Sequence, residues 1–496
     1  MKLWEDIVNK ATLGSAKLPL KSVDVPENIA EEYELIDSKD PEDDFLRFAS
    51  LIFQYRQAGS LPLNFQSVTQ TQAKPEIKSY CSAKANGVLK TILEEELIPF
   101  LKMWLQLCSS RDACVAPELI PELFDVALRK RELETLILDV SGNRGAWLCH
   151  LNSEWNFNSP TVDSNELWET GDREDRRKLL RALRTTNPAD ALELLKTTWA
   201  SEGANEKVTF LEMLRINLSS EDLAWLEDLK EKGQKVNATI LELIKSIPQS
   251  TIVRAYADVL RKAINIRKGK ALLGMINKTS LEVSDDLLIP ESVFKSGIDK
   301  LSSDKNISDN QSILAQLIMA VPPTLWNDHL QLSTEDVIRL FQKEKQTAFY
   351  LPALAIASVK FGDKVWIKSM LDFADASVIR DSIVSLINGL SGNEKDINAQ
   401  KFFKEMPKEI TQIMLYQEEE WSFELAKLVV KYVSSDIYSY NRGFYRQAAP
   451  LIPVSILDAM DMFAQSDEQK AYWKNQSDEL TRLLNIKQQI LQSFNA

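Results

Sequence analysis

The sequence contains little glycine and little histidine. Glycine accounts for only 15 of the 496 residues, about 3% where ~7% is usual. Tight turns of β-rich and nucleotide-binding folds depend on glycine, so its scarcity favours helices joined by short polar turns. The two histidines, His150 and His329, leave few of the usual options for general acid–base catalysis.

Catalytic and nucleotide-binding motifs are also missing: the sequence has no GxxxxGK[ST], GxGxxG, HExxH or GxSxG. We therefore expect a protein that is not an enzyme and needs no cofactor. The four cysteines, Cys81, Cys108, Cys114 and Cys149, form no CxxC pair, which favours reduced thiols over a disulfide framework. Three of them with His150 do not have the spacing of a compact zinc site, so ordinary packing is the interpretation.

Long apolar runs are absent. Residues 1–20 carry charges and lack the apolar core of a secretory signal, and no stretch of about 18 apolar residues occurs. We expect a cytoplasmic protein that does not associate with membranes. The net charge of −13 repels phosphate backbones and disfavours general nucleic-acid binding.

A repeat is the main feature that is present. An amphipathic run at 179–184 recurs at 210–215 and at 240–245, with offsets of 31 and 30 residues. This period suits a pair of short helices stacked on its neighbours. Start signals agree with it, because Asn187-Pro188 resembles an N-cap followed by proline and Ser219 with Asp222 resembles a capping box.

These patterns predict an all-α protein, a HEAT-like helical-repeat solenoid with an N-terminal helical region. We divide the chain into an N-terminal helical region with an acidic loop (1–165), a HEAT-like repeat block (166–270) and a C-terminal helical region (271–496). The acidic segment 22–44 holds ten acids and one lysine, which suits a solvated loop or a docking strip for a basic partner. Residues 271–312 are expected to be polar and loop-rich, and a long helix over 468–494 is expected to cap the array.

Two basic stretches interrupt the acidic background. The first carries Arg173, Arg176, Arg177, Lys178, Arg181 and Arg184; the second carries Arg254, Arg261, Lys262, Arg267, Lys268 and Lys270. If the repeats stack in register, both stretches would lie along one side. Solvated helix faces, a groove for an acidic protein and a nucleic-acid groove are the three interpretations, and the net charge favours protein over nucleic acid.

The segment before the repeats supplies the other candidate residues. A turn is expected at 141–145, where Arg144 would bind a carboxylate or phosphate, or pair with a nearby acid. Trp147, Trp155 and Trp168 surround this turn, and they suit either core anchoring or an aromatic groove for a peptide.

These residues also carry a resemblance to a known family. Residues 119–155 resemble a signature in which an LPxLLxL helix precedes a GxRGxWL turn and an NPxW, found here as IPELF, GNRGAWL and NSEW. Ser153 departs from the expected proline. The likeness continues through Trp168 to Gly171, Asn187-Pro188, Trp199 and the LSSED run at 218–222. The family is an uncharacterised bacterial one of HEAT-like helical proteins.

The resemblance implies a role by association. Such proteins tend to be encoded beside MoxR-type AAA+ ATPases, von Willebrand A-domain proteins and SWIM zinc-finger proteins. We therefore expect a non-enzymatic scaffold or adaptor for protein–protein interaction that serves an AAA+ ATPase and its A-domain partner. The alternative is a nucleic-acid-binding repeat protein that uses the basic helix faces, and a third hypothesis is a hydrolase or transferase centred on Arg144.

Overall fold

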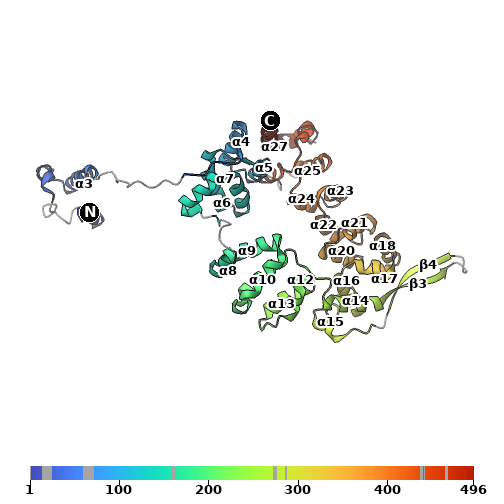
Figure 1. Ribbon diagram of the computed structural model, residues 1–496. Helices are drawn as coiled ribbons and strands as arrows, with labels where there is room; N and C mark the ends of the chain where they lie inside the picture. Colours follow the sequence, from blue (N-terminus) through green and yellow to red (C-terminus); the bar gives the residue numbers. More distant parts are fainter. Residues whose placement is uncertain are drawn as a thin grey trace. The chain divides into compact units, whose positions relative to one another are not determined.

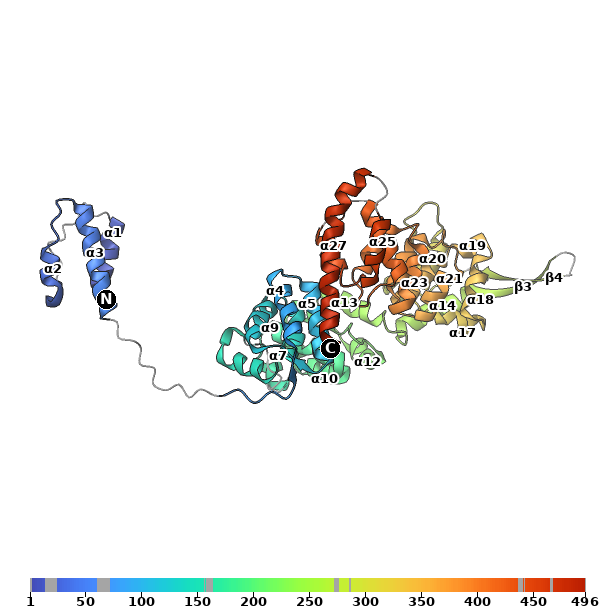
Figure 2. The same cartoon turned by 90° about the horizontal axis from the view of Figure 1, so that it is seen from above.

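The computed structural model describes residues 2–13, 25–59, 72–155, 157, 164–271, 276–284, 287–435, 440, 442–463 and 467–495. Figures 1 and 2 show that the chain is mostly helical, as the sequence predicts. It divides into two compact units, Met1–Gln72 and Ala73–Ala496. Among the described residues, no helix has both the length and the apolar character needed to cross a bilayer.

The described part of the first unit contains the helices α1 (Lys2–Leu13), α2 (Ala30–Glu34) and α3 (Pro41–Ala58), with a short 3-10 helix at Glu27–Ile29. Asp40 caps α3, because its carboxylate accepts the main-chain N–H of Glu42. A small core of Ile7, Ile29, Phe48 and Ile52 joins the helices.

The acidic segment is therefore not one continuous loop. Part of it forms α2, and residues 42–44 lie in the first turn of α3. Carboxylates in that position interact favourably with the helix dipole, so the acids contribute to the start of α3.

The second unit begins with α4 (Ala83–Glu94), α5 (Ile98–Ser110), α6 (Ile120–Arg129) and α7 (Glu134–Leu151). Two short strands, β1 (Ser79–Tyr80) and β2 (Ala113–Cys114), pair in parallel. We call the segment 73–82, which contains β1, the strap. It lies against α5 and α7 through hydrogen bonds described below.

The predicted repeats form helices, with bounds α8 (Ser164–Thr170), α9 (Arg173–Thr186), α10 (Pro188–Thr198), α11 (Ala204–Met213), α12 (Ser220–Asp228), α13 (Gln234–Ile244) and α14 (Thr251–Ala263). The first helices of successive pairs, α9, α11 and α13, contact one another in order, while α10 packs on α9 and α12 on α13. The capping box of Ser219 and Asp222 is confirmed at the start of α12. One core cluster, within residues 168–247, joins this block.

A β-hairpin follows the block, where the sequence led us to expect no strand. β3 (Ile264–Ala271) and β4 (Ile276–Val283) pair antiparallel, with Ile264 opposite Val283. The expectation of a loop-rich segment from residue 271 is wrong over β4. The missed signal is the alternation of apolar and polar residues from Ile264 to Arg267, which is typical of a strand with one buried face.

Helices return after the hairpin, as expected, and pack on helices near them in the chain, with the most extensive contacts between α16 and α20 and between α18 and α21. Their bounds are α15 (Glu291–Lys295), α16 (Asp309–Met319), α17 (Thr324–Leu330), α18 (Thr334–Gln342), α19 (Lys345–Ala348), α20 (Leu351–Lys360), α21 (Lys364–Phe373), α22 (Ile383–Asn388), α23 (Gly392–Phe402), α24 (Pro407–Met414), α25 (Phe423–Ser435), α26 (Arg442–Ala448) and α27 (Asp467–Phe494).

The last helix contacts the first helices of the same unit. α27 packs on α4 and α5, and the rings of Trp104 and Phe494 lie 5.3 Å apart edge to face. Arg482 forms an ion pair with Glu95 at 2.5 Å. Apolar residues of α4–α7 and of the segment from Val253 to Phe494 therefore belong to one core cluster.

Candidate partner-binding surfaces

Helix α9 carries the first basic stretch, and helical geometry divides its arginines between two faces. Asp172 caps the helix by accepting the main-chain N–H of Asp175 at 2.9 Å. Residues four apart lie on the same face of a helix. Arg176 and Arg184 share a face with buried Leu180, whereas Arg173, Arg177 and Arg181 follow the neighbouring edge of the helix.

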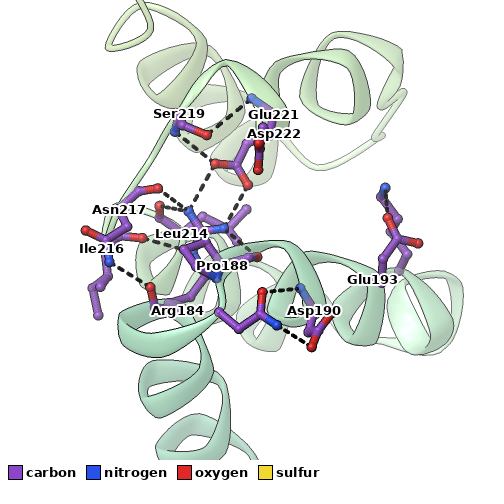
Figure 3. Close-up of polar contacts among 12 residues, drawn as sticks. Arg184, Pro188, Asp190, Glu193, Leu214, Ile216, Asn217, Ser219, Glu221 and Asp222 are labelled. Carbon is purple, nitrogen blue, oxygen red and sulfur yellow. Dashed lines mark hydrogen bonds and ion pairs between the residues drawn. The ribbon is translucent and has the colours of Figure 1, made fainter.

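Arg184 is completely buried and is held by an unusually full set of acceptors (Figure 3). Its two terminal nitrogens donate to the two carboxylate oxygens of Asp222 at 2.8 and 3.0 Å. Its remaining contacts are to the main-chain carbonyls of Pro188, Leu214, Ile216 and Asn217. The prediction that Arg184 belongs to a partner-binding face is wrong, because its guanidinium is buried and its hydrogen bonds go to acceptors inside the protein.

The same carboxylate organises the start of α12. Asp222 accepts the main-chain N–H of Ser219 at 3.0 Å, and Ser219 in turn caps the helix (Figure 3). Asn217, with a left-handed backbone (φ 52°), donates its amide to the carbonyl of Arg184 at 2.9 Å. This network fixes the end of α9 against the turn between α11 and α12.

Arg176 is also structural. Its guanidinium forms an ion pair with Glu202 and lies over the ring of Trp168, 4.4 Å from the centroid. Both side chains of the ion pair are largely buried, at 17% and 7% exposure. Arg176, like Arg184, therefore has its guanidinium bound to groups inside the protein and is not part of the exposed surface.

The basic residues of α9 whose side chains reach solvent remain, and we call exposed Arg173, Lys178 and Arg181 with half-buried Arg177 the α9 basic face. Arg173 pairs with Glu206 at 2.9 Å and Arg177 with Glu174 at 2.6 Å. Among the described residues, neither Lys178 nor Arg181 has an ion-pair partner.

Beside this face, a hollow of about 240 Å³ lies between α9 and α11. It is lined by Arg173, Glu174, Arg177, Asn205, Glu206, Thr209 and Phe210. It combines an aromatic ring with charged groups, which suits one side chain of a protein partner.

The second basic stretch begins on α14, whose buried residues belong to the larger core cluster and not to that of the repeat block. Arg254, Arg261 and Lys262 are exposed on α14, and Arg261 pairs with Asp258 at 2.9 Å. α14 packs mainly on α15, α16 and β3, whereas α9 packs mainly on α8, α10 and α11. The two stretches therefore lie on helices that pack into different core clusters.

The expected turn at 141–145 is a kink inside α7. Gly142 has φ 58° and ψ −156°, and the helix resumes after it. The main-chain N–H groups of Asn143 and Arg144 donate to the carboxylate of Glu76 in the strap, at 2.9 and 2.6 Å. The carboxylate of Glu76 thus occupies the position at the start of the helix where an anion binds. The side chain of Arg144 is exposed.

The three tryptophans differ in their surroundings. Trp155 packs edge to face on Phe124, with centroids 5.3 Å apart, and donates to Asp125 at 3.3 Å. Trp168 is buried in the core of the repeat block, and Trp147 is half-buried on α7. Core anchoring is therefore the role of Trp155 and Trp168.

The zinc alternative is not supported by the side-chain positions. Among the described residues, no group of three or more cysteine, histidine or acidic side chains could hold a metal ion. Cys108 instead contacts Cys81, with their sulfur atoms 3.3 Å apart.

One cleft was missed by the sequence analysis. A cavity of about 470 Å³ lies between α5, the loop after α24, α26 and α27. Lys487 lies at its wall, 2% exposed, and donates to Glu420 at 2.5 Å and to the Ile452 carbonyl at 2.6 Å. Burial lowers the pKa of Lys487, while Glu420 opposes that shift. No local signal in the sequence joins α5 to α27.

The described residues form a mostly helical protein that carries exposed basic residues on α9 and α14. The sequence profile of a family of unknown function, DUF5691, matches residues 6–494, and the chain belongs to this family. No curated protein and no solved structure matches the chain.

Proposed function

We propose that this chain is a non-enzymatic helical-repeat scaffold or adaptor of HEAT-like architecture that binds other proteins. The α9 basic face is the docking site in this proposal, and an acidic segment of a partner is its ligand. The observation that carries the proposal is that Lys178 and Arg181 are exposed and lack ion pairs among the described residues, on a helix whose Arg176 and Arg184 are fixed inside.

The surrounding contacts support this choice. The surface pairs Arg173–Glu206 and Arg177–Glu174 involve exposed arginines, and such pairs contribute only about 0–1 kcal/mol. A carboxylate of a partner can therefore replace Glu174 or Glu206 at little cost. Buried Arg184 and Arg176 hold the helix in place, so the face is ordered before a partner binds.

The partner class follows from the family resemblance rather than from the geometry. We propose a MoxR-type AAA+ ATPase and its von Willebrand A-domain protein as the partners. The exposed basic residues of α14 give the alternative, nucleic-acid binding through phosphates, which the net charge of −13 opposes.

Affinity purification from the native cell tests the proposal, with and without a non-hydrolysable ATP analogue. We expect stoichiometric recovery of the ATPase or the A-domain protein with the wild-type chain, and loss of most of it with Lys178→Glu/Arg181→Glu. The matched control is Lys404→Glu/Lys408→Glu, which reverses two exposed lysines near α24.

Two results would contradict the proposal. One is equal recovery of the partner with both double variants. The other is turnover by the purified chain that a single side-chain substitution abolishes. Recovery of nucleic acid whose binding weakens steeply with salt would favour the alternative.

A further inference from the structure

Two thiols lie in contact where the strap meets α5. Cys81 follows β1 directly, and Cys108 lies in the last turns of α5. Their sulfur atoms are 3.3 Å apart. Cys81 is partly exposed, whereas Cys108 is completely buried.

The backbone around both residues is fixed by hydrogen bonds, so their proximity is a property of the fold. The N–H of Cys81 donates to the carbonyl of Cys114 at 2.8 Å, which continues the pairing of β1 with β2. The thiol of Cys108 also donates to the carbonyl of Ala113 at 3.3 Å, and the indole of Trp104 joins α5 to α4 through the carbonyl of Ala85 at 3.0 Å. A disulfide is ~2.05 Å long, so the two sulfur atoms need to approach by about 1.2 Å from their distance of 3.3 Å.

The electrostatics differ between the two thiols. The hydrogen bond from Cys108 lowers the pKa of Cys81, and the same bond together with burial raises the pKa of Cys108. Burial raises the pKa of Cys114 to about 11 and also raises that of Cys149. Cys81 is therefore the thiol with the most thiolate character, and it is partly accessible to solvent.

We propose that Cys81 and Cys108 are a redox modification site that forms a reversible disulfide in response to a peroxide. The thiolate of Cys81 attacks one peroxide oxygen, an S–O bond forms, the O–O bond breaks, and the departing hydroxide takes up a proton to become water. The sulfur of Cys108 then attacks the resulting sulfenic acid, an S–S bond forms, and a second water leaves with the proton of Cys108. Two thiols lose two electrons, and hydrogen peroxide is reduced to two waters.

The bond joins the strap to α5 covalently and closes a loop that contains α4. The strap is otherwise held by Glu76 on the α7 kink and by Lys78, which pairs with Asp139 at 2.7 Å. The disulfide adds a link that does not depend on charge and constrains the unfolded chain, so the melting temperature of this region rises on oxidation.

Alkylation and mass spectrometry of the full chain after hydrogen peroxide test the proposal. We expect a linked peptide joining Cys81 to Cys108, its loss after dithiothreitol, and consumption of the Cys81 thiol about tenfold faster than that of Cys149. Cys81→Ser abolishes the link, whereas Cys114→Ser and Cys149→Ser retain it. Because Cys81 is partly exposed, its variant is the one expected to fold, and circular dichroism checks this.

Other outcomes overturn the proposal. These are free Cys81 and Cys108 after Cys149 has been oxidised, a link that joins Cys81 to Cys114 instead, or a link that forms only in denaturant. None of them bears on partner binding by α9, so the two proposals fail independently.

Discussion

Basic residues on a single helix have two different roles at the residue scale. Arg176 and Arg184 lie on the inward face of α9 and stabilise the repeat block, while Lys178 and Arg181 are exposed. The sequence shows how many arginines α9 carries but not which of them are buried. Most of the groups that accept hydrogen bonds from the buried arginines come from residues near 202 and from 214–222, outside α9. Periodicity alone indicates two faces, and only the location of Asp222 shows which face is inward.

Replacing Arg184 tests this division. We expect Arg184→Met to lower the free energy of unfolding of the repeat block by about 3–5 kcal/mol, because Asp222 would be left buried without its partner. The control Arg181→Met should change it by no more than about 0.5 kcal/mol. Urea denaturation measures both. Similar losses for the two variants would show that Arg184 is not specially held.

Tyr350 gives a second residue-scale prediction. It is completely buried, and its hydroxyl has no hydrogen-bond partner in the described part of the chain. Tyr350→Phe removes a polar group that was desolvated without compensation. We therefore expect the free energy of unfolding at neutral pH to be unchanged or to rise by up to about 1–3 kcal/mol. Urea denaturation measures it.

The pH dependence of the same residue has a definite sign. Burial raises the pKa of Tyr350 from 10.0 to about 12. Between these values the folded state keeps the proton that the unfolded state has released, so the free energy of unfolding falls as pH rises from 10 to 12. Tyr350→Phe should lose less stability over this window, and equal losses would contradict the assignment.

At the scale of elements, the sequence predicts helices better than it predicts their interruptions. The repeat helices and the cap of α12 follow from local apolar spacing and from Ser219, which neighbouring residues determine. The kink in α7 does not, because the carboxylate that stabilises it comes from Glu76, 67 residues away from Asn143. Because that distant contact is not visible in the local sequence, Gly142 predicts a turn where the structure has a kink inside a helix.

Substitutions at two glycines test the difference between the kink in α7 and a regular helix. In Gly142→Ala the new Cβ would lie 2.4 Å from the carboxylate of Glu76, at a φ of 58°. We expect a loss of about 1–3 kcal/mol or more, with faster hydrogen exchange in the strap. Gly87→Ala, in α4 where no atom lies within 4 Å of the new Cβ, should instead gain about 0.5–1 kcal/mol. A neutral Gly142→Ala would contradict the close contact.

At the scale of the second unit, contacts between its first and last helices unite most of the apolar core. α27 contributes Leu480, Leu483 and Ile490 to the same cluster as α4 and α5, while the repeat block has its own cluster. The sequence predicts the helix over 468–494 and its apolar stripe. It does not predict that the stripe covers α4 and α5, because that contact spans almost the whole unit.

Hydrogen exchange after Ile490→Ala tests this arrangement. Removing a fully buried isoleucine costs about 2–5 kcal/mol, and the loss should extend through the shared core. We expect faster exchange in α4 and α5 and unchanged exchange in α9–α13. Equal acceleration in the repeat block would show that the two clusters unfold together.

The central claim is that the chain binds a protein through the α9 basic face, and a hydrogen-exchange footprint on the purified complex tests it most directly. The complex is recovered from native cells and compared with the chain alone at low and high salt. The account predicts protection of α9 and α11 that weakens as salt rises, with the cleft beside Lys487 unchanged. Protection confined to that cleft or to α14 and β3, or no protection at all, would contradict it.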